Sequence, residues 1–509
     1  MKTFLMYRDR DVDMQQALPW NAGDLIQDLG LERLFAVMAS ADRFLPEVAK
    51  RSVLCGLPGV DSIVYRQDVL RDCLANPGVI REIYALAEEA IKNEGHYFWG
   101  LRTRNVGSIL RRGTELLQMF LGILRRLRAL AERHRNDFTS DGFERFFTML
   151  ASELDDDYLA LAEDHLRRVE FRGGILMSAR LGRGNQGDDY VLRDYEPRLP
   201  RWFERLFAPK ESGYTYRLHP RDESGMRALS ELGDRGINLV ADALAQSADH
   251  ILAFFTTLRY ETGFYVACVN LYEALAAKNE PVCFPLLSDA GTGIHDFTGL
   301  YDVCLSLSAQ QRVVGNDCNA DGKAMILVTG ANQGGKSTFL RSVGTSQLMM
   351  ECGMFVPAIS LRASLCSGLF THYKREEDVE MKSGKFDEEL RRMSDLTGHL
   401  RPNALVLFNE SFAATNDREG SEIARQIAEA LVDSGMRVCF VTHLYEFAHR
   451  IWEERAAQTR FLRAERGQEG KRTFRLVEGE PLPTSYGEDV YRRVFAGEKR
   501  GCAKQRQPG

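Results

Sequence analysis

The sequence predicts a mainly α-helical region with a small β insertion, followed by an α/β domain built on a parallel sheet. Three observations lead to this fold class. Apolar residues recur three and four positions apart over most of the chain before Lys278, which is the period of an amphipathic helix. Beyond it, short apolar runs alternate with helical segments, as expected for strands buried on both faces of a parallel sheet. A glycine-rich loop joins one of these runs to the helix after it.

The helical region contains three long stretches. The first runs from about Asp24 to Asn136, and the second covers about Asp141 to Val169. The third begins after Pro220 and reaches Lys278, with a break expected near Gly263.

A β insertion is predicted at about residues 169–218. Gly174–Leu181 and Asp189–Leu192 are two strand-like runs, and the turn-rich segment Gly182–Asp188 between them is typical of a long hairpin loop. Tyr214–Leu218 is a further strand candidate.

The α/β domain is predicted from three apolar strands and the two helices between them. These are the strands Ala324–Thr329, Ala404–Phe408 and Arg437–Thr442, and the helices Ser337–Cys352 and Glu419–Ser434. We therefore expect a helical region over residues 1–285, the α/β domain over 286–495 and a flexible tail over 496–509.

Composition excludes several classes of protein. With 66 Lys+Arg against 72 Asp+Glu, the net charge of -6 is not that of a globally basic nucleic-acid coat, although a local basic face remains open. No apolar run approaches the roughly 18 residues that a membrane span needs, and the charged first fifteen residues do not resemble a secretory signal. The ten cysteines form no Cys-x-x-Cys pair, which disfavours a zinc site or a disulfide framework and favours a cytoplasmic protein.

The glycine-rich loop fits G-x-x-x-x-G-K-[ST] at every fixed position, as Gly330-Ala331-Asn332-Gln333-Gly334-Gly335-Lys336-Ser337. Glycines let successive N–H groups face an anion, and the N-terminus of the next helix adds its dipole. We expect Lys336 to reach the β- and γ-phosphates of a nucleotide and the Ser337 hydroxyl to bind Mg²⁺. The alternative is a glycine-rich turn without a ligand, but the strand before and the helix after favour nucleotide binding.

Asn409 and Glu410 follow the second apolar strand, where a phosphate-loop protein places its Mg²⁺-side acid and the residue that polarises the attacking water. Glu410 is the candidate general base. Asn409 occupies the position where an aspartate is expected, and its amide oxygen can hold a metal-bound water without contributing charge to Mg²⁺. The alternative role for Glu410 is to cap a helix or turn.

His443 follows the third strand. A side chain at the C-terminal end of a parallel strand lies beside the ligand crevice, so His443 is a candidate to sense the γ-phosphate or to hold the attacking water. The alternative is a purely structural histidine.

Together, these segments resemble the ATPase domain of the MutS family of DNA mismatch-repair proteins. The matching stretches are Val328–Thr338, Asn409-Glu410-Ser411 with Thr415 and Gly420, Thr442-His443, and Ser485-Tyr486-Gly487. Many families share the phosphate loop, whereas this combination is far more specific, and the likeness is strongest over residues 290–495. The resemblance implies an ABC-type P-loop ATPase that uses ATP and Mg²⁺, with Thr338 completing the nucleotide loop.

The resemblance also implies a homodimer, because a Ser-Gly element of one subunit completes the nucleotide site of the other in ABC-type ATPases. Ser383, followed by Gly384, is the candidate for the residue that meets the partner's γ-phosphate. The alternative is that Ser383 is an ordinary helix N-cap, because acidic residues follow it.

The first half resembles the helical core of the same family, with lever helices and a small β clamp that holds the DNA backbone. The family's mismatch readers carry an N-terminal domain with a Phe-x-Glu motif, and no such motif occurs in the first hundred residues. We therefore expect a shortened member that lacks the mismatch-reading and connector domains.

Six arginines are candidates for DNA contact. The segment Leu101–Asn136 contains nine arginines and two glutamates, a local charge of +7, which could neutralise phosphates without reading sequence. The alternative is a salt-bridged helix face, because Leu116 and Phe120 fall on a core face among the arginines. The candidates are Arg111, Arg112, Arg125 and Arg126 in this segment, and Arg180 and Arg183 beside the hairpin loop.

The predicted function is ATP-dependent binding of double-stranded or structured DNA by a dimeric clamp, in mismatch repair or a related process, with no membrane partner. Two alternatives remain open. One is a nucleotide-gated clamp with little turnover, because Asn409 weakens Mg²⁺ retention. The other is a family relative that acts on branched nucleic acid or ribosomes.

Overall fold

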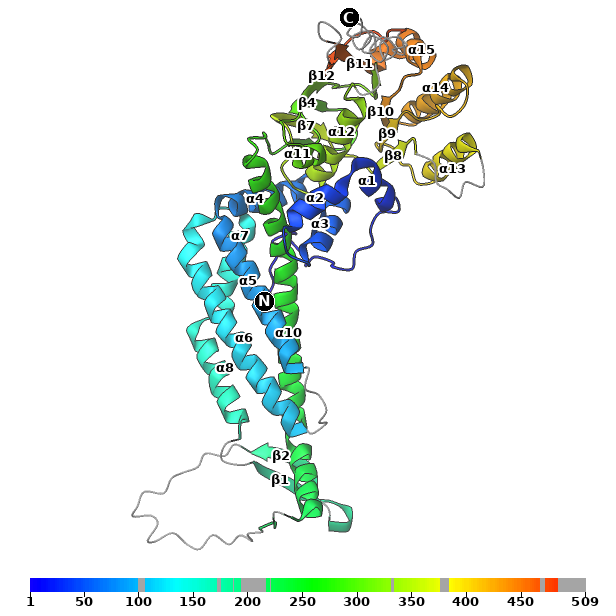
Figure 1. Cartoon of the computed structure of the whole chain (residues 1–509). Helices are drawn as coiled ribbons and strands as arrows, with labels where there is room; N and C mark the ends of the chain where they lie inside the picture. The colour runs from blue at the N-terminus through cyan, green and yellow to red at the C-terminus, as the bar shows by residue number, and fades with distance from the viewer. Residues whose placement is uncertain are drawn as a thin grey trace, which may run out of the picture. The chain divides into compact units, whose positions relative to one another are not determined.

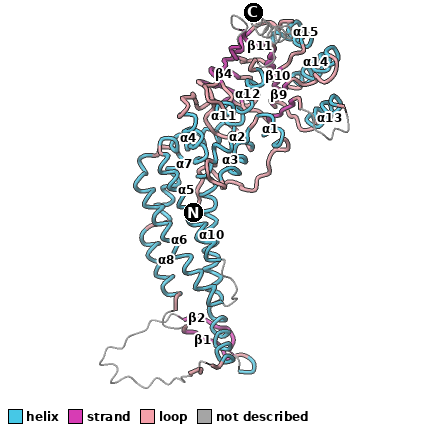
Figure 2. The backbone as a smooth tube through the Cα atoms, viewed as in Figure 1, coloured by secondary structure: helices cyan, strands magenta, loops and turns pink. Residues whose placement is uncertain are grey.

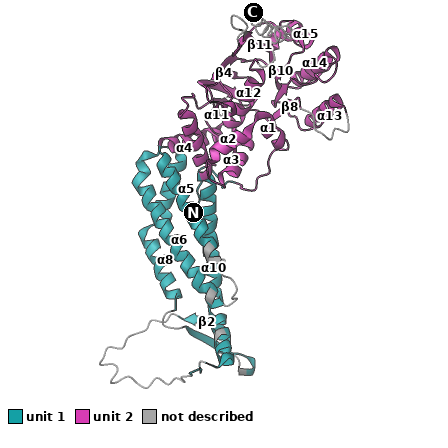
Figure 3. Ribbon diagram, in the orientation of Figure 1, with its two compact units in different colours: residues 1–5, 9–12, 76–262 teal, residues 6–8, 13–75, 263–509 magenta. Residues whose placement is uncertain are grey.

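The computed structural model describes residues 1–98, 106–171, 175–185, 187–193, 217–219, 221–330, 334–375, 384–466 and 472–483. The chain is a mixed α/β protein (Figures 1 and 2). It divides into two compact units (Figure 3): unit 1 comprises residues 1–5, 9–12 and 76–262, and unit 2 comprises 6–8, 13–75 and 263–509. The helices of residues 13–75 cluster with the sheets, although sequence periodicity groups them with the other helices. Periodicity shows that a helix has a buried face but not which element covers it.

Unit 1 consists mainly of long helices, and α6 packs against α5, α7 and α8 (Figure 1). The apolar stripe of α6 is buried as expected, since Phe120 and Leu124 are at most 1 % exposed. The helical run predicted over 141–169 is confirmed and consists of two helices, because Asp155 starts a new helix by accepting a 2.7 Å hydrogen bond from the Tyr158 N–H. The elements are α5 (Pro77–Phe98), α6 (Val106–His134), η1 (Arg135–Asp137), α7 (Asp141–Glu153), α8 (Asp156–Val169) and the larger part of α10 (Glu223–Ala276).

The β insertion contains the predicted hairpin. β1 (Leu176–Leu181) pairs antiparallel with β2 (Gly187–Arg193), and the short helix η2 (Arg183–Asn185) lies between them. The strand predicted at 214–218 begins outside the described residues, and 217–218 are not in a strand.

Helix α10 is continuous through Gly263, so the predicted break is wrong. A glycine inside a helix costs only about 1 kcal/mol relative to alanine. Burial of the aromatic side chains of Phe264 and Tyr265, which are fully buried, exceeds that cost.

Unit 2 contains a six-stranded sheet in the order β12-β11-β6-β10-β9-β8. The five strands from β11 to β8 are parallel, and β12 is an antiparallel edge strand. The three apolar runs of the sequence are its central strands, as predicted. The strands are β6 (Met325–Thr329), β8 (Leu369–Tyr373), β9 (Leu405–Asn409), β10 (Arg437–Val441), β11 (Thr459–Arg466) and β12 (Arg472–Glu478).

Helices cover both faces of this sheet. Val406 and Phe408 of β9 belong to a core cluster that includes side chains of α13, α14 and α15. The intervening Leu407 contacts Gly344 of α12, so it points to the opposite face. The helices of unit 2 are α1 (Ala22–Leu29), α2 (Leu31–Ala39), α3 (Leu45–Leu54), α4 (Val60–Ala75), α11 (Val303–Ser308), α12 (Lys336–Glu351), α13 (Lys385–Thr397), α14 (Asp417–Asp433), α15 (Tyr445–Arg455) and η3 (Ala456–Gln458).

A second sheet of unit 2 has the order β3-β7-β4-β5, with β3 and β7 parallel and the other pairs antiparallel. Its strands are β3 (Leu286–Ser288), β4 (His295–Leu300), β5 (Asn316–Asn319) and β7 (Ser360–Ser364). Among the helices of the described residues, none has the length and apolar character needed to span a membrane.

Acidification is expected to destabilise unit 2 through two buried histidines. Burial lowers the pKa of His372 to about 4 and that of His295 to about 3. In the unfolded chain both rings take up a proton near pH 6.5, so the unfolded state binds more protons as pH falls below that value. Stability is therefore lost between pH 6.5 and 4, by about 3 kcal/mol for each histidine at pH 4.

Thermal unfolding between pH 7 and 4 measures this effect. The double variant H295Q/H372Q should show a flatter pH dependence than the parent, whereas H399Q, at an exposed site, should not. An equal slope in parent and double variant would contradict the assignment.

Candidate functional site

The phosphate loop joins β6 to α12. Gly330 and Gly335 adopt positive φ angles of 120° and 91°, which disfavour any other residue. A Cβ atom on Gly330 would also lie 3.0 Å from Ala464, which is tighter than most Cβ contacts and would require Ala464 to shift. Gly334 is buried, and α12 begins at Lys336. The glycines of the motif are thus required by backbone geometry as well as by the close approach of β11.

Lys336 carries a buried ammonium group beside a backbone carbonyl and a carboxylate. It is 3 % exposed, and its Nζ donates a 2.7 Å hydrogen bond to the Gly330 carbonyl and lies 3.8 Å from Glu410 Oε1. Burial lowers the pKa of Lys336, and the nearby Glu410 carboxylate partly opposes this effect. A cation held in this way at a helix N-terminus fits an anionic ligand such as a phosphate.

Ser337 and Asn409 lie together although 72 positions separate them. The Ser337 hydroxyl donates a 2.8 Å hydrogen bond to Asn409 Oδ1, which orients the amide of Asn409. Thr338 follows in the first turn of α12. Hydroxyl and amide oxygens are suitable ligands for Mg²⁺ or its bound waters, so these two residues fit the ion.

Glu410 points its carboxylate between two basic groups. Besides Lys336, His443 Nδ1 lies 3.9 Å from Glu410 Oε2, which is too long for a hydrogen bond but within ion-pair range for a protonated ring. The side chains of Glu410 and His443 are 25 % and 39 % exposed, so water reaches both. Asn416, not Glu410, is the N-cap of helix α14, so Glu410 does not cap that helix.

Strand register explains why these side chains meet. Val441 of β10 pairs with Val328 of β6 on one side and with Asn409 of β9 on the other. Because the three strands are parallel, the residues that follow them emerge at one edge of the sheet. Glu410 and His443 thus lie beside Lys336, as predicted from their positions directly after apolar parallel strands.

Four of the predicted nucleotide-site residues lie outside the described part of the chain: Ala331, Asn332, Gln333 and Ser383. The Ser485-Tyr486-Gly487 segment lies outside it too. The N-cap of α13 is Gly384.

Most of the arginines proposed to contact DNA form ion pairs with acidic side chains. Helices α5 and α8 supply some of the carboxylates, so the +7 charge of the segment is not the charge of the folded surface. Arg112 is half-buried and Arg183 is exposed. The pairs are Arg111–Glu115 at 3.0 Å, Arg126–Glu89 at 2.7 Å, Arg180–Asp189 at 3.5 Å, and Arg125–Glu163.

Sequence reasoning missed one group of polar residues beside this site. His372 of β8, Ser411 and Glu389 of α13 form a buried hydrogen-bonded cluster that touches the turn after Glu410. The available signal was a histidine inside the otherwise apolar and hydroxyl-bearing run Leu369–Tyr373.

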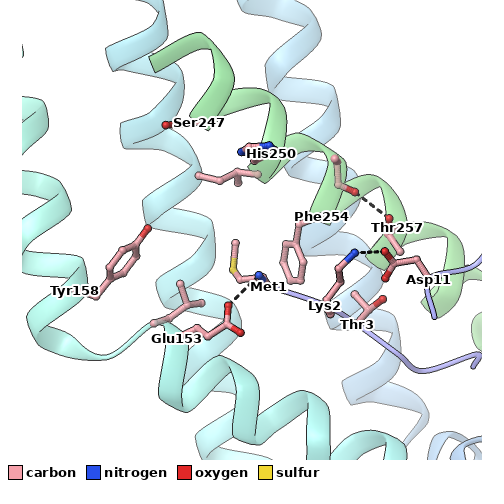
Figure 4. A pocket seen from close by; sticks show the side chains of 13 residues that line it. Met1, Lys2, Thr3, Asp11, Glu153, Tyr158, Ser247, His250, Phe254 and Thr257 are labelled. Atoms are coloured by element: carbon pink, nitrogen blue, oxygen red, sulfur yellow. Dashed lines mark hydrogen bonds and ion pairs between the residues drawn. The ribbon is translucent and has the colours of Figure 1, made fainter. Parts of the chain in front are cut away.

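A cavity of about 720 Å³ lies in unit 1 (Figure 4). Its charged groups pair with each other: the Met1 ammonium is 2.9 Å from Glu153, and Lys2 pairs with Asp11. We assign no candidate chemistry to this cavity.

Two family models match the chain. Residues 59–278 match the MutS2 N-terminal domain, and residues 326–499 match MutS domain V. The second match contains Lys336, Asn409, Glu410 and His443.

Individual relatives are also similar to the chain over part of its length. The DNA mismatch repair protein MutS of Synechococcus sp. (strain WH7803) is 31 % identical over 185 residues, 36 % of this chain and 20 % of that protein. The protein of the same name from Microcystis aeruginosa (strain NIES-843 / IAM M-2473) is 30 % identical over 267 residues, which are 51 % of this chain and 29 % of that protein. MutS protein homolog 4 of Mus musculus is 28 % identical over 151 residues, which are 30 % of this chain and 16 % of that protein. The match therefore spans less than a third of each relative.

Proposed function

The chain belongs to the MutS family, and from this premise we propose that it binds and hydrolyses ATP and that the nucleotide changes its hold on DNA. The observation that carries the proposal is the convergence of Lys336, Ser337, Asn409, Glu410 and His443 at one edge of the six-stranded sheet. In this proposal unit 2 contains an ABC-type P-loop ATPase site, the region before it acts as lever and clamp, and residues 286–495 form the ATPase domain.

Each residue has a role that its geometry allows. Lys336 and the N-terminus of α12 would hold the phosphates of ATP, with residues 330–338 forming the loop around them. Ser337 and Asn409 would hold Mg²⁺, which when bound neutralises charge on the phosphates. Glu410 would take a proton from the attacking water, and His443 would orient that water or sense the γ-phosphate.

A homodimer is part of the proposal, because a Ser-Gly element of a second subunit would complete each nucleotide site. Ser383 is the residue we propose for this contact. Coupling between the nucleotide and DNA sites is then a linkage, in which each ligand changes the affinity for the other by the same factor.

The principal test is DNA binding by the purified protein with and without ATP, at one stated salt concentration. Mispaired, branched and fully paired duplexes and ribosomal particles should be compared in the same assay. We expect ATP to change the affinity for DNA. Preferential capture of ribosomal particles would contradict the DNA proposal and support the second candidate below.

Arginine variants in the same assay locate the DNA contact. Because Arg125 and Arg126 are paired with Glu163 and Glu89, we expect R125A/R126A to bind like the parent. R183A, at the hairpin, should bind more weakly and lower the slope of log K against log salt by about 0.9, because Arg183 is exposed, whereas Arg180 is paired with Asp189. The reverse pattern would place the contact on helix α6.

A second candidate function is suggested by the helical region. Residues 59–278 are similar to a domain named for MutS2, a different name from the mismatch-repair relatives. We therefore retain branched nucleic acid or ribosomes as the alternative target.

A further inference from the structure

We propose that His372 is a positioning residue that couples helix α13 to Glu410 through the Ser411 hydroxyl. The proposal rests on the proposed ATPase function and adds a way in which the placement of α13 would affect hydrolysis. Three observations support it: the hydrogen bonds of the His372 ring, the backbone conformation around Glu410 and the attachment of α13.

His372 connects two elements that are distant in sequence. Its Nε2 lies 3.0 Å from the backbone carbonyl of Glu389 in α13, and its Nδ1 lies 2.8 Å from Ser411 Oγ. His372 and Ser411 are 1 % and 0 % exposed, so water does not compete for these bonds. The ring also stacks on Phe412, with 5.2 Å between ring centroids.

Hydrogen-bond chemistry fixes which nitrogen of the His372 ring carries the proton. A carbonyl only accepts, so Nε2 must carry the proton and donate to Glu389. In the neutral ring Nδ1 is then an acceptor, and the Ser411 hydroxyl donates to it or to the His372 carbonyl, 2.5 Å away. Burial lowers the pKa of His372 to about 4, which keeps the ring neutral near pH 7.

The backbone around Ser411 needs this support. Glu410 and Phe412, on either side of it, have positive φ angles of 53° and 63°. Residues other than glycine rarely adopt this backbone conformation, and it persists only where surrounding contacts hold it. The left-handed turn determines where the Glu410 carboxylate points, so contacts that hold Ser411 also aim the general base.

Helix α13 is attached to the same turn by a second bond. The Glu389 carboxylate accepts a 3.0 Å hydrogen bond from the Phe412 N–H. One turn further on, Arg392 donates a 3.0 Å hydrogen bond to the Tyr373 carbonyl of β8. Movement of α13 along the sheet would therefore disturb both sides of Ser411.

The position of α13 gives this connection a functional meaning. The helix begins at Lys385, directly after Ser383-Gly384, the element proposed to meet the nucleotide of a second subunit. A shift of that element would reach Glu410 of its own subunit through Glu389, His372 and Ser411. The two nucleotide sites of the proposed dimer would be coupled by this route.

Two variants break the connection at different points. H372F removes both ring hydrogen bonds but keeps an aromatic ring on Phe412, and S411A removes only the hydroxyl. We expect kcat for ATP to fall about tenfold or more in each, with the ATP affinity of the site changed less than about threefold, because a small displacement of a catalytic group slows chemistry strongly. The double variant should be no slower than the slower single variant, because both changes interrupt one path.

His399 provides the matched control. It lies just after α13, its Nδ1 donates to the Asp395 carbonyl, and its ring stacks on Trp20, so it shares the types of contact of His372 but does not touch the Glu410 turn. H399F should leave kcat within about twofold of the parent. Unchanged kcat in folded H372F and S411A, or losses that multiply in the double variant, would overturn the proposal.

Amide hydrogen exchange tests the connection without any turnover. S411A should increase exchange in α13 as well as in the turn at 410–412, although Ser411 is not part of that helix. Unchanged exchange in α13 would overturn the coupling even if kcat fell. If the parent hydrolyses no ATP, the proposed function fails, and the exchange result still decides whether His372 couples these elements.

Discussion

Replacement of Lys336 by alanine is expected to abolish ATP binding. The ammonium group is buried, donates a hydrogen bond to the Gly330 carbonyl, lies 3.8 Å from Glu410 Oε1 and is at the N-terminus of α12. Losing a buried charge that faces a phosphate costs about 3 kcal/mol or more, so the dissociation constant for ATP should rise at least about 100-fold. Equilibrium binding of a fluorescent ATP analogue measures the change.

The thermal stability of K336A should not fall along with its ATP affinity. Burial lowers the pKa of Lys336, which means that the fold disfavours its charged form. Without nucleotide, K336A should therefore melt at the same temperature as the parent or higher. K323A is the matched control, because Lys323 Nζ is exposed and bonds only to the Ala457 carbonyl among the contacts described for it. Tight ATP binding by K336A would remove the phosphate-loop assignment.

Replacement of Glu410 by glutamine is expected to stop ATP hydrolysis while ATP binding persists. Glutamine has the same shape but cannot accept a proton from water at neutral pH, and general-base catalysis contributes about 10²- to 10⁴-fold. The steady-state rate should thus fall at least about 100-fold, with an ATP dissociation constant within about threefold of that of the parent. A coupled phosphate-release assay and the binding assay give both values.

The control for E410Q is E446Q, which alters an exposed carboxylate near the start of α15. It should leave the rate unchanged. Near-parental turnover by E410Q would assign the base to another group, with His443 as the next candidate. A parent that binds ATP but shows no turnover would instead support the clamp with little hydrolysis, in which neutral Asn409 holds Mg²⁺ weakly.

The sequence predicts the architecture of unit 2 well because its signals are local. Strand β6 is an uninterrupted apolar run, and glycines with positive φ angles mark the loop after it. Strands β9 and β10 end at the residues expected, within one position. Parallel pairing then places Glu410 and His443 beside Lys336, which requires only strand order and direction.

Other features depend on contacts that local patterns do not contain. Arginine density in α6 predicts a basic arm, but Glu89 and Glu163 of neighbouring helices neutralise two of its members. Gly263 predicts a break in α10, but buried aromatic neighbours keep the helix continuous. For the arginines, ion pairs with neighbouring helices offset the local charge. For Gly263, packing outweighs the low helix propensity of glycine, which is about 1 kcal/mol.

The sequence by itself determines the phosphate loop, the strands that flank it and the family to which the chain is similar, because these depend on residue type at short spacing. Only the tertiary structure decides how Glu410 is held. His372, Ser411 and Glu389 come from β8, the turn after β9 and helix α13, and they meet because the sheet brings β8 beside β9. No motif marks them, since a buried hydrogen bond is specified by the relative positions of folded elements rather than by spacing along the chain.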